Sequence, residues 1–359
     1  MNKQPLDGPP LRAAEAGASI ENAKGELAPQ VAVFQMLNGA RVAQVVYVAA
    51  KLGIADFLRD GPKTAAQLAQ LTGSDAPSLY RLLRGLASLG IFAEEAGQSF
   101  QLTPRAELLR SDRADSLRSL ALFILDPYWW SSTGDMLYCV QTGQPAPPHL
   151  YGVDEWEYLA QHPETAAVFQ AAMTANTFRQ IPAILEAYDF SQMHTLVDIG
   201  GGQGALLAAV LRAHPAVHGV LFDRPEGLDG ARVALTESGV VDRCEVVTGD
   251  MFGALPSRGD GYLLKLILHD WDDQRALQIL SNIRRCMPGS SRVLLIEDVI
   301  LPGNDPQHGK LLDLAMLAYN GGRERTAAEW QDLLEAAGFR LIRITPTRAS
   351  LSIIEGVPD

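Results

Sequence analysis

The fold of this chain is decided by residues 195–204, which read TLVDIGGGQG. Residues 195–199 form an apolar run typical of a buried strand, and residues 205–213 have the pattern of a helix. The glycine-rich residues between them permit a tight turn, in which backbone N–H groups and a helix N-terminus can approach a ligand. The stretch therefore predicts the first strand, ligand-binding turn and helix of a parallel α/β sheet.

Three further apolar runs end in small or charged residues, as strands do at the ligand-binding edge of a parallel sheet. They read LFDRP (221–225), GDMF (249–252) and LLKLILHDW (263–271). Asp223 lies 19 residues after Gly204 (223 − 204), where a carboxylate can accept hydrogen bonds from ribose hydroxyls. Together the four segments predict a cofactor that contains a nucleoside.

The glycine turn alone also fits a relaxed dinucleotide fingerprint, with Gly200, Gly202 and Ala205 at the required spacing. A nicotinamide-dependent oxidoreductase is therefore an alternative, and binding of NAD would favour it. Such an enzyme has no evident need for the residues at 250–251 or for the His-Asp-Trp at 269–271.

These residues resemble the class I, S-adenosylmethionine-dependent small-molecule O-methyltransferases of the caffeic acid type, which include bacterial natural-product enzymes. The resemblance runs from about Glu26 to the C-terminus and rests on VDIGGGQG, FDRP, GDMF, LKLILHDWDD, GGRERT and EAAGF in combination. It implies an α/β fold: a Rossmann-like methyltransferase domain after an N-terminal, mainly helical winged-helix dimerisation domain. It also implies a homodimer in which that domain contributes one wall of the partner's site.

The resemblance implies S-adenosylmethionine as cofactor, with S-adenosylhomocysteine as its product. Asp198 would order the glycine turn, Asp223 would bind the ribose, and Asp250 would accept from the adenine amino group. Met251 would pack on the adenine ring, and Lys265 lies where the family often has a lysine. The alternatives are a loop cap for Asp250, a core position for Met251 and a solvated lysine. The predicted cofactor set is Asp198, Gly200, Gly202, Gly204, Asp223, Asp250, Met251 and Lys265.

His269 is predicted to be the general base. A phenol has a pKa of about 10 and is a poor nucleophile at neutral pH, whereas an imidazole can take its proton. The resemblance implies that two acids flank this histidine: Glu297, after a predicted strand at 292–296, and Glu324 of GGRERT. A purely structural histidine is the alternative. Asp270 is expected to cap the following helix or order the loop.

The acceptor pocket is predicted from fewer residues. The family clamps a flat aromatic acceptor between methionines where Met173 and Met316 lie, and it binds a ring substituent where Asn320 lies. Adjacent Trp129 and Trp130 cannot both face one core, so one of them is expected in the pocket. Met316 could instead be a core residue of an amphipathic helix. The predicted acceptor set is Met173, Asp313, Met316, Asn320 and Trp129.

The predicted reaction is methyl transfer from S-adenosylmethionine to a hydroxyl of an aromatic small molecule, as in natural-product biosynthesis. The alternative within the same fold retains the cofactor but catalyses hydroxylation, decarboxylation or a pericyclic reaction. No metal is predicted, because the histidines show no ligand spacing. They are His149, His162, His194, His214, His218, His269 and His308.

Composition limits the partners. The 359 residues carry a formal net charge of −12, which argues against a nucleic-acid partner. A winged-helix DNA-binding regulator is weighed because a predicted helix carries Arg81 and Arg84, but no broad basic stripe surrounds it. Neither a signal peptide nor an apolar stretch long enough for a bilayer is recognised, so the predicted location is the cytoplasm, away from membranes. The cysteines show no paired spacing, as in reduced cytosolic proteins; they are Cys139, Cys244 and Cys286.

The order along the chain predicts four parts: a disordered tail (1–27), the dimerisation domain (28–111), a helical connector that contributes to the substrate pocket (112–179) and the catalytic domain (180–359). Within them, two helices are expected at 29–38 and 39–52, and two more are expected to be capped by Thr64 and by Ser74 or Asp75. A hairpin is expected at 91–93 and 99–102, and a rigid linker at 145–148.

Overall fold

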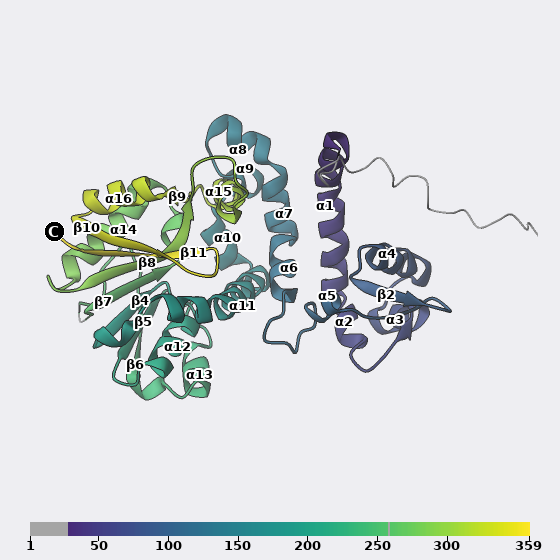
Figure 1. Ribbon diagram of the computed structural model, residues 1–359, viewed down its shortest axis with the longest axis horizontal. Coiled ribbons are helices and arrows are strands. Elements are labelled where there is room, and N and C mark those ends of the chain that lie inside the picture. The colour runs from purple at the N-terminus through teal and green to yellow at the C-terminus, as the bar shows by residue number, and fades with distance from the viewer. Residues whose placement is uncertain (1–27, 258) are drawn as a thin grey trace, which may run out of the picture. The chain divides into compact units, whose positions relative to one another are not determined.

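The computed structural model describes residues 28–257 and 259–359, which form two compact units that divide between Thr103 and Pro104 (Figure 1). The predicted tail, 1–27, lies outside the described residues. The predicted boundary at 179/180 falls inside one continuous helix, α11 (Pro163–Ala187).

The first unit is a small helical domain with one three-stranded antiparallel sheet, in the order β1-β3-β2. Thr64 and Asp75 cap their helices as predicted: Thr64 Oγ1 accepts from the backbone N–H of Gln67, and Asp75 from that of Ser78. The expected hairpin is present, closed by β2 and β3. The elements are α1 (Pro29–Lys51), α2 (Ile54–Phe57), β1 (Lys63–Thr64), α3 (Ala65–Thr72), α4 (Ala76–Ser88), β2 (Phe92–Glu95) and β3 (Ser99–Leu102).

Helix α1 corrects two expectations. It is a single helix through Gly39, where a Cβ would meet no atom within 4 Å, so this glycine neither ends the helix nor serves a close contact. Among the described residues it is also the one helix long and apolar enough to cross a membrane, by length and composition alone. Its exposed apolar side chains include Val33, Phe34, Met36 and Leu37.

The second unit begins with seven helices, of which all but α5 contribute to an aromatic core. Residues 145–148, expected to be a linker, instead begin α9, because prolines are accepted in the first turn of a helix. Ala146 and Pro147 are buried there. These helices are α5 (Pro104–Glu107), α6 (Arg118–Ile124), α7 (Pro127–Gly134), α8 (Met136–Thr142), α9 (Ala146–Tyr151), α10 (Glu155–Gln161) and α11.

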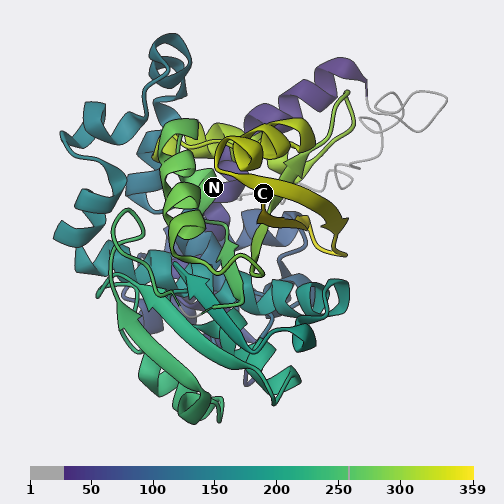
Figure 2. The same cartoon turned by 90° about the vertical axis from the view of Figure 1, so that its left-hand side faces the viewer.

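The sheet of the second unit has the path β10-β11-β8-β7-β4-β5-β6, and β9 pairs with β8 beside it. The strands from β8 to β6 are parallel, and β11 is antiparallel to β8 and β10. The C-terminal β10–β11 hairpin, yellow in Figure 2, forms one edge of this sheet. The strands are β4 (Thr195–Ile199), β5 (His218–Asp223), β6 (Cys244–Thr248), β7 (Gly261–Lys265), β8 (Arg292–Ile300), β9 (Arg325–Thr326), β10 (Phe339–Pro346) and β11 (Leu351–Pro358).

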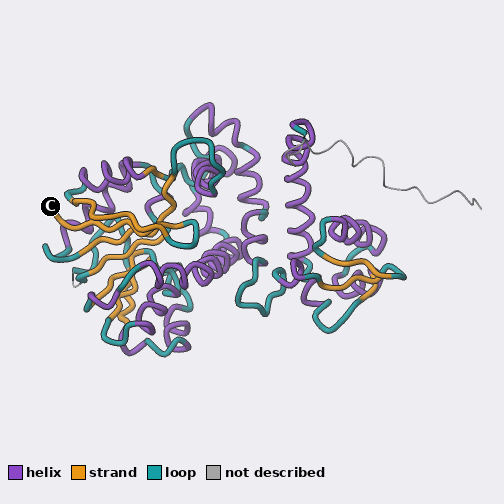
Figure 3. Tube along the Cα trace, viewed as in Figure 1, coloured by secondary structure: helices purple, strands orange, loops and turns teal. Residues whose placement is uncertain are grey.

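Helices cover both faces of this sheet (Figure 3). Alternate residues of β4 point to opposite faces: Leu196 packs with α11, α12 and α13, and Val197 packs with α14 and α16. Strand β4 lies between β5, which follows it in the chain, and β7, which pairs with its other side, so the strand order reverses at β4. Ligands of open α/β sheets bind at such a reversal. The remaining helices are α12 (Ala205–Ala213), α13 (Ala231–Glu237), α14 (Asp273–Cys286), α15 (His308–Tyr319) and α16 (Ala327–Ala336), with short 3₁₀ turns η1 (Phe190–Gln192), η2 (Val241–Arg243) and η3 (Leu268–Asp270).

Strand β8 is longer than predicted. The prediction ended it at residue 296, but pairing with β11 continues to Asp298 and pairing with β9 reaches Ile300. Glu297 therefore lies inside a strand, which fixes its backbone by ladder hydrogen bonds.

Candidate active site

The glycine turn after β4 is packed on one side and open on the other. A Cβ on Gly200 would lie 2.5 Å from Cδ1 of Ile267, and one on Gly201 would lie 2.6 Å from Cγ of Asp198. A Cβ on Gly202 would meet no atom within 4 Å, although the φ of +57° there disfavours other residues. This turn therefore offers bare backbone to a ligand on its open side.

Asp223 connects the end of β5 to this turn. Its Oδ2 accepts from the backbone N–H of Gly202 at 2.8 Å, and its Oδ1 accepts from that of Arg224 at 2.7 Å. Burial raises the pKa of Asp223. Burial also raises the pKa of Asp198, beneath the turn, to about 7; the negative charge of Asp223 adds to this shift, and the positive charge of Lys265 opposes it. Each Asp223 oxygen keeps a second lone pair, so the carboxylate could also accept from ribose hydroxyls.

Asp250 and Met251 follow β6. The Asp250 side chain accepts from the backbone N–H of Phe252 at 2.9 Å, which is the loop-cap arrangement given above as the alternative, and it stays exposed. Met251 is half-buried, and its Cε lies 3.6 Å from the position of a Cβ on Gly200. The structure thus brings Met251 beside the glycine turn.

Lys265 is half-buried at the end of β7, and its Nζ donates to Oγ1 of Thr177 on α11 at 3.2 Å. Burial lowers the pKa of this lysine to about 8, and the carboxylates of Glu297 and Asp198 counteract the shift. The amine therefore lies within electrostatic reach of Asp198, beneath the glycine turn, and of Glu297, described next.

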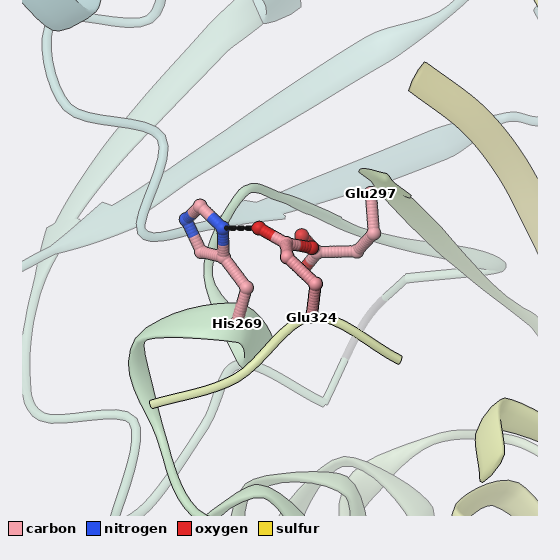
Figure 4. Close-up of side chains that lie close together, drawn as sticks. All are labelled: His269, Glu297 and Glu324. Carbon is pink, nitrogen blue, oxygen red and sulfur yellow. Dashed lines mark hydrogen bonds and ion pairs between the residues drawn. The ribbon is translucent and has the colours of Figure 1, made fainter. Parts of the chain in front are cut away.

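His269 lies on η3, immediately beyond β7, and is buried (Figure 4). Its Nδ1 is 2.6 Å from Oε1 of Glu324, and its Nε2 is 3.5 Å from a carboxylate oxygen of Asp270. The backbone N–H of Glu324 donates to Oδ1 of Asp313 at 2.8 Å, so Asp313, predicted to contact the acceptor, positions Glu324. A carboxylate on Nδ1 fixes the ring and leaves Nε2 as the nitrogen able to take a proton.

Glu297 contacts the same turn differently. Its Oε1 accepts from the backbone N–H groups of Ile267 at 3.2 Å and Leu268 at 2.9 Å. The other oxygens, Oε2 of Glu297 and Oε2 of Glu324, have no hydrogen-bond partner among the described residues. Burial raises the pKa of Glu297 to about 7 and that of Glu324 to about 8. Two such buried carboxyl groups are expected to hold one proton between them, on Glu297, because the N–H at Nδ1 of His269 favours the ionised form of Glu324.

The three side chains could also ligate a cation. One ligand atom each from His269, Glu297 and Glu324 lies within 4.8 Å of the others. One imidazole and two carboxylates are a donor set that divalent metals accept. The prediction that no metal is needed therefore stays a prediction.

Asn320 and Asp270 form the polar side of the site. Asn320 Nδ2 donates to Oδ1 of Asp270 at 3.0 Å, and Asn320 Oδ1 accepts from the backbone N–H of Gly322 at 3.0 Å. Asp272, not Asp270, caps α14, by accepting from the N–H of Arg275. Asp270 therefore orders the loop, and burial raises its pKa to about 7.

The remaining acceptor residues are not brought to one point. Trp129 has no exposed surface; it packs against Phe123 and donates from Nε1 to Oε1 of Glu155 at 2.7 Å. Met316 is buried in the same aromatic core, whereas Met173 is half-buried on α11. Their contacts with an acceptor stay predictions.

Sequence reasoning missed two buried charged residues of the site. Glu155 lies beneath Trp129 and beside Asn320, and burial raises its pKa to about 7. Arg325, next to Glu324, has no exposed surface. Arg325 stands in the GGRERT segment that identified Glu324, so its position was a usable signal, whereas nothing in the local sequence marks Glu155.

Comparison with known proteins shows the family to which the chain belongs. A family model for the O-methyltransferase domain matches residues 134–340, and one for the O-methyltransferase dimerisation domain matches residues 34–112. Phenazine O-methyltransferase PhzM of Lysobacter antibioticus is 46% identical over 91% of this chain and 95% of its own. The 8-amino-8-demethylriboflavin N,N-dimethyltransferase of Streptomyces davaonensis is 39% identical over 90% and 94%.

Solved structures agree in the same way. The crystal structure of LaPhzM has a TM-score of 0.90 and 45% identity, covering 93% of this chain and 100% of that one. An O-methyltransferase from neocarzinostatin biosynthesis, solved with S-adenosylmethionine and 2-hydroxy-5-methyl naphthoic acid, has a TM-score of 0.79 and 34% identity, covering 89% and 96%.

The chain belongs to the O-methyltransferase family, in which a class I methyltransferase fold follows a dimerisation domain. It is an enzyme of the S-adenosylmethionine-dependent kind, related to bacterial natural-product O-methyltransferases and to N-methyltransferases.

Proposed function

We propose that this enzyme methylates a hydroxyl group of a flat aromatic small molecule, with His269 as the general base. The observation that carries the proposal is the 2.6 Å hydrogen bond between His269 Nδ1 and Glu324 Oε1. This contact orients the ring in a buried site and leaves Nε2 to take a proton.

When bound, S-adenosylmethionine supplies a methyl group that a positively charged sulfur already activates. The protein's task is then to place the acceptor and remove its proton. His269 would take the hydroxyl proton of the acceptor at Nε2. The acceptor oxygen would then gain the methyl group, and the bond between that carbon and the cofactor sulfur would break to leave S-adenosylhomocysteine. The Glu324 carboxylate stabilises the imidazolium that forms, and it does so more strongly in this buried position than in water.

The open side of the glycine turn supports the cofactor assignment. Gly202 leaves room where a Cβ would otherwise project, as a close approach of the ligand to backbone requires. Asp223 is proposed to bind the ribose hydroxyls. Met251, beside the turn, is proposed to pack on the adenine, and Asp250 to accept from its amino group.

The acceptor class is inferred from the relatives and from the aromatic core. The relatives' names refer to phenazine, riboflavin and naphthoic acid frameworks, all flat and aromatic. Met173 and Met316 are proposed to lie against such a ring. Asn320 is proposed to reach a ring substituent through the lone pair that Gly322 leaves free on its Oδ1.

A second candidate reaction is methylation of an aromatic amine, which the riboflavin-related relative favours. A neutral amine already has a lone pair on the attacking nitrogen, so its reaction depends less on prior removal of a proton. The contribution of His269 to turnover therefore distinguishes the two candidates. A cofactor-dependent reaction without methyl transfer is the remaining alternative, and it would give no labelled product.

The proposal is tested by measuring the rate at which a labelled methyl group passes from S-adenosylmethionine to each of a panel of phenols and matched anilines. His269→Asn should slow methylation of the phenol by about 10²- to 10⁴-fold, the usual range for a general base. The matched control is His218→Asn, an exposed residue at the amino end of β5, whereas His269 follows the carboxyl end of β7. A phenol turnover within a few-fold of wild type in His269→Asn would contradict the base assignment. A chelator should leave turnover unchanged if no metal is needed.

The enzyme is also proposed to work as a cytoplasmic homodimer. The exposed apolar residues of α1 lie mostly within the stretch that matches the dimerisation domain, which gives them a role other than membrane insertion. Sedimentation of the whole chain in detergent-free buffer tests this proposal, and a monomer at micromolar concentration would contradict it.

A further inference from the structure

The buried guanidinium of Arg325 is not used by the reaction described above. Its Nη1 donates to the carbonyl oxygen of Leu268 at 3.0 Å, and its Nη2 donates to that of Trp271 at 3.0 Å. Its Nε donates to Oδ1 of Asp273 at 2.9 Å, and Cζ lies 5.1 Å from the centre of the Trp330 ring. Leu268 and Trp271 flank His269, so one side chain binds the backbone on both sides of the base.

The turn that carries His269, residues 266–271, is also bound at its beginning, by the carboxylate of Glu297. Glu297 Oε1 accepts from the N–H groups of Ile267 and Leu268, as described above. Between β7 and these two residues stands Leu266, a non-glycine residue with φ of +52°. A left-handed leucine costs energy and persists only where its surroundings hold it. Glu297 and Arg325 supply that restraint from opposite ends of the turn.

The segment that carries Arg325 touches the turn by its backbone as well. The N–H of Arg323 donates to the carbonyl oxygen of His269 at 2.8 Å. A Cβ on Gly322 would lie only 2.0 Å from the same oxygen, so this approach needs glycine. Residues 322–325 therefore bind His269 through its backbone, and Glu324 binds its ring.

From this arrangement we propose that Arg325 is a positioning residue that fixes the His269 imidazole between Glu324 and the acceptor. It acts through the carbonyl groups of Leu268 and Trp271 and touches neither cofactor nor acceptor. This inference rests on the proposed base role of His269. We therefore expect that replacing Arg325 lowers kcat but leaves the affinity for the cofactor unchanged, because the glycine turn and Asp223 lie at the ends of other strands.

The first variant is Arg325→Lys, which keeps the charge but cannot bind two carbonyl groups and a carboxylate with one planar fork. We expect kcat to fall by about 10²-fold, the effect of a displacement of about 1 Å in a catalytic group. The KM for S-adenosylmethionine should stay within about two-fold of wild type, since the cofactor contacts are untouched. The matched control is Arg243→Lys, whose two Nη atoms bind the carbonyls of Val217 and Leu211 at 2.8 Å, at the far edge of the sheet.

A readout independent of activity is the ¹⁵N spectrum of the His269 imidazole, assigned by its loss in His269→Asn. Wild type should give one tautomer, with hydrogen on Nδ1, whereas Arg325→Lys should give a mixture. An unchanged spectrum together with wild-type kcat would overturn the inference. The inference would also be overturned if kcat, cofactor affinity and melting temperature all fell together. That result is expected of an arginine whose role is purely structural.

If Arg325→Lys does not fold, Asp273→Asn provides a milder change. Asp273 is exposed; its Oδ1 contacts Nε and Nη2 of Arg325, and its Oδ2 contacts Nη1 of Arg323, but it touches neither backbone carbonyl that Arg325 binds. We expect the same direction in kcat and tautomer, at about ten-fold or less; no change in either would count against the inference. If His269→Asn keeps full activity while the Arg325→Lys spectrum still changes, the base assignment fails and the positioning role stands.

Discussion

The substitution Glu324→Gln tests the acid–base assignment most directly. Gln has nearly the shape of Glu, and its carbonyl oxygen can still accept from Nδ1 of His269, so the ring should keep its place. What disappears is the negative charge beside the imidazolium that forms during proton transfer.

The magnitude follows from the geometry. A hydrogen bond to a charged group contributes about 1.5 kcal/mol more than a neutral one, which sets the lower bound. Two unit charges about 4 Å apart, at an effective dielectric constant of about 20, attract by about 4 kcal/mol, which sets the upper bound. Since about 1.4 kcal/mol is a factor of ten in rate, kcat for a phenol should fall by about 10- to 10³-fold.

The assay is single-turnover methylation of a phenol with saturating labelled cofactor, accompanied by calorimetric measurement of cofactor affinity. Glu297→Gln is the companion variant: its amide oxygen can still accept from Ile267 and Leu268, and it does not contact the ring directly, so its loss should be smaller. A Glu324→Gln rate within three-fold of wild type would refute the reasoning. A loss that appears only in KM would refute it equally, because the charge would then act on binding.

Other variants test other parts of the structure. Asp223→Asn should weaken cofactor binding by about 10- to 100-fold, the value of a hydrogen bond to a charged group, and calorimetry should show little change for the acceptor; equal losses would contradict the ribose assignment. Gly202→Ala should cost about 1–2 kcal/mol in the free energy of unfolding because of its positive φ, and should weaken cofactor binding more than ten-fold because the new Cβ occupies the open side of the turn; unchanged affinity in titrations would show that the ligand lies elsewhere. Burial raises the pKa of Glu155 from its ordinary 4.5 to about 7, so between these pH values the folded chain holds a proton that the unfolded chain has lost, and stability falls as pH rises through this window. Glu155→Gln should therefore flatten the decline of melting temperature between about pH 5 and 7, and an identical slope in both proteins would mean that Glu155 does not titrate there.

The sequence predicted the parts of the site that follow directly from strand ends. The glycine turn, Asp223 and His269 stand at positions where an apolar run stops, and a parallel sheet brings such positions to one edge. Glu324 precedes the short strand β9 and was predicted only from the family resemblance. The contact of His269 with Glu324 was implied by the family resemblance, and the structure places these residues 2.6 Å apart.

Other features depended on contacts between distant segments. The Asp313 carboxylate accepts a hydrogen bond from the backbone N–H of Glu324, so it already has a partner within the protein. The Trp129 side chain is enclosed by the aromatic core and has no exposed surface. Glu155 could not be found from its neighbours in sequence, because its burial arises from packing around Trp129. Helix α1 passes through Gly39 because the surrounding apolar residues favour a long helix more than one glycine, at a cost of about 1 kcal/mol, disfavours it.

The separation between the two halves of the site has an evolutionary consequence. The residues proposed to bind the cofactor stand mainly after β4, β5 and β6, whereas the proposed base His269 stands on η3 and the groups that hold it stand on β8 and the short segment 322–325. Changes in the segment 322–325 can remove the acid that orients His269, or displace the histidine itself, while leaving the glycine turn and Asp223 intact. An ancestral methyltransferase could in this way acquire a different reaction through changes in a few neighbouring codons, without first losing its ability to bind the cofactor.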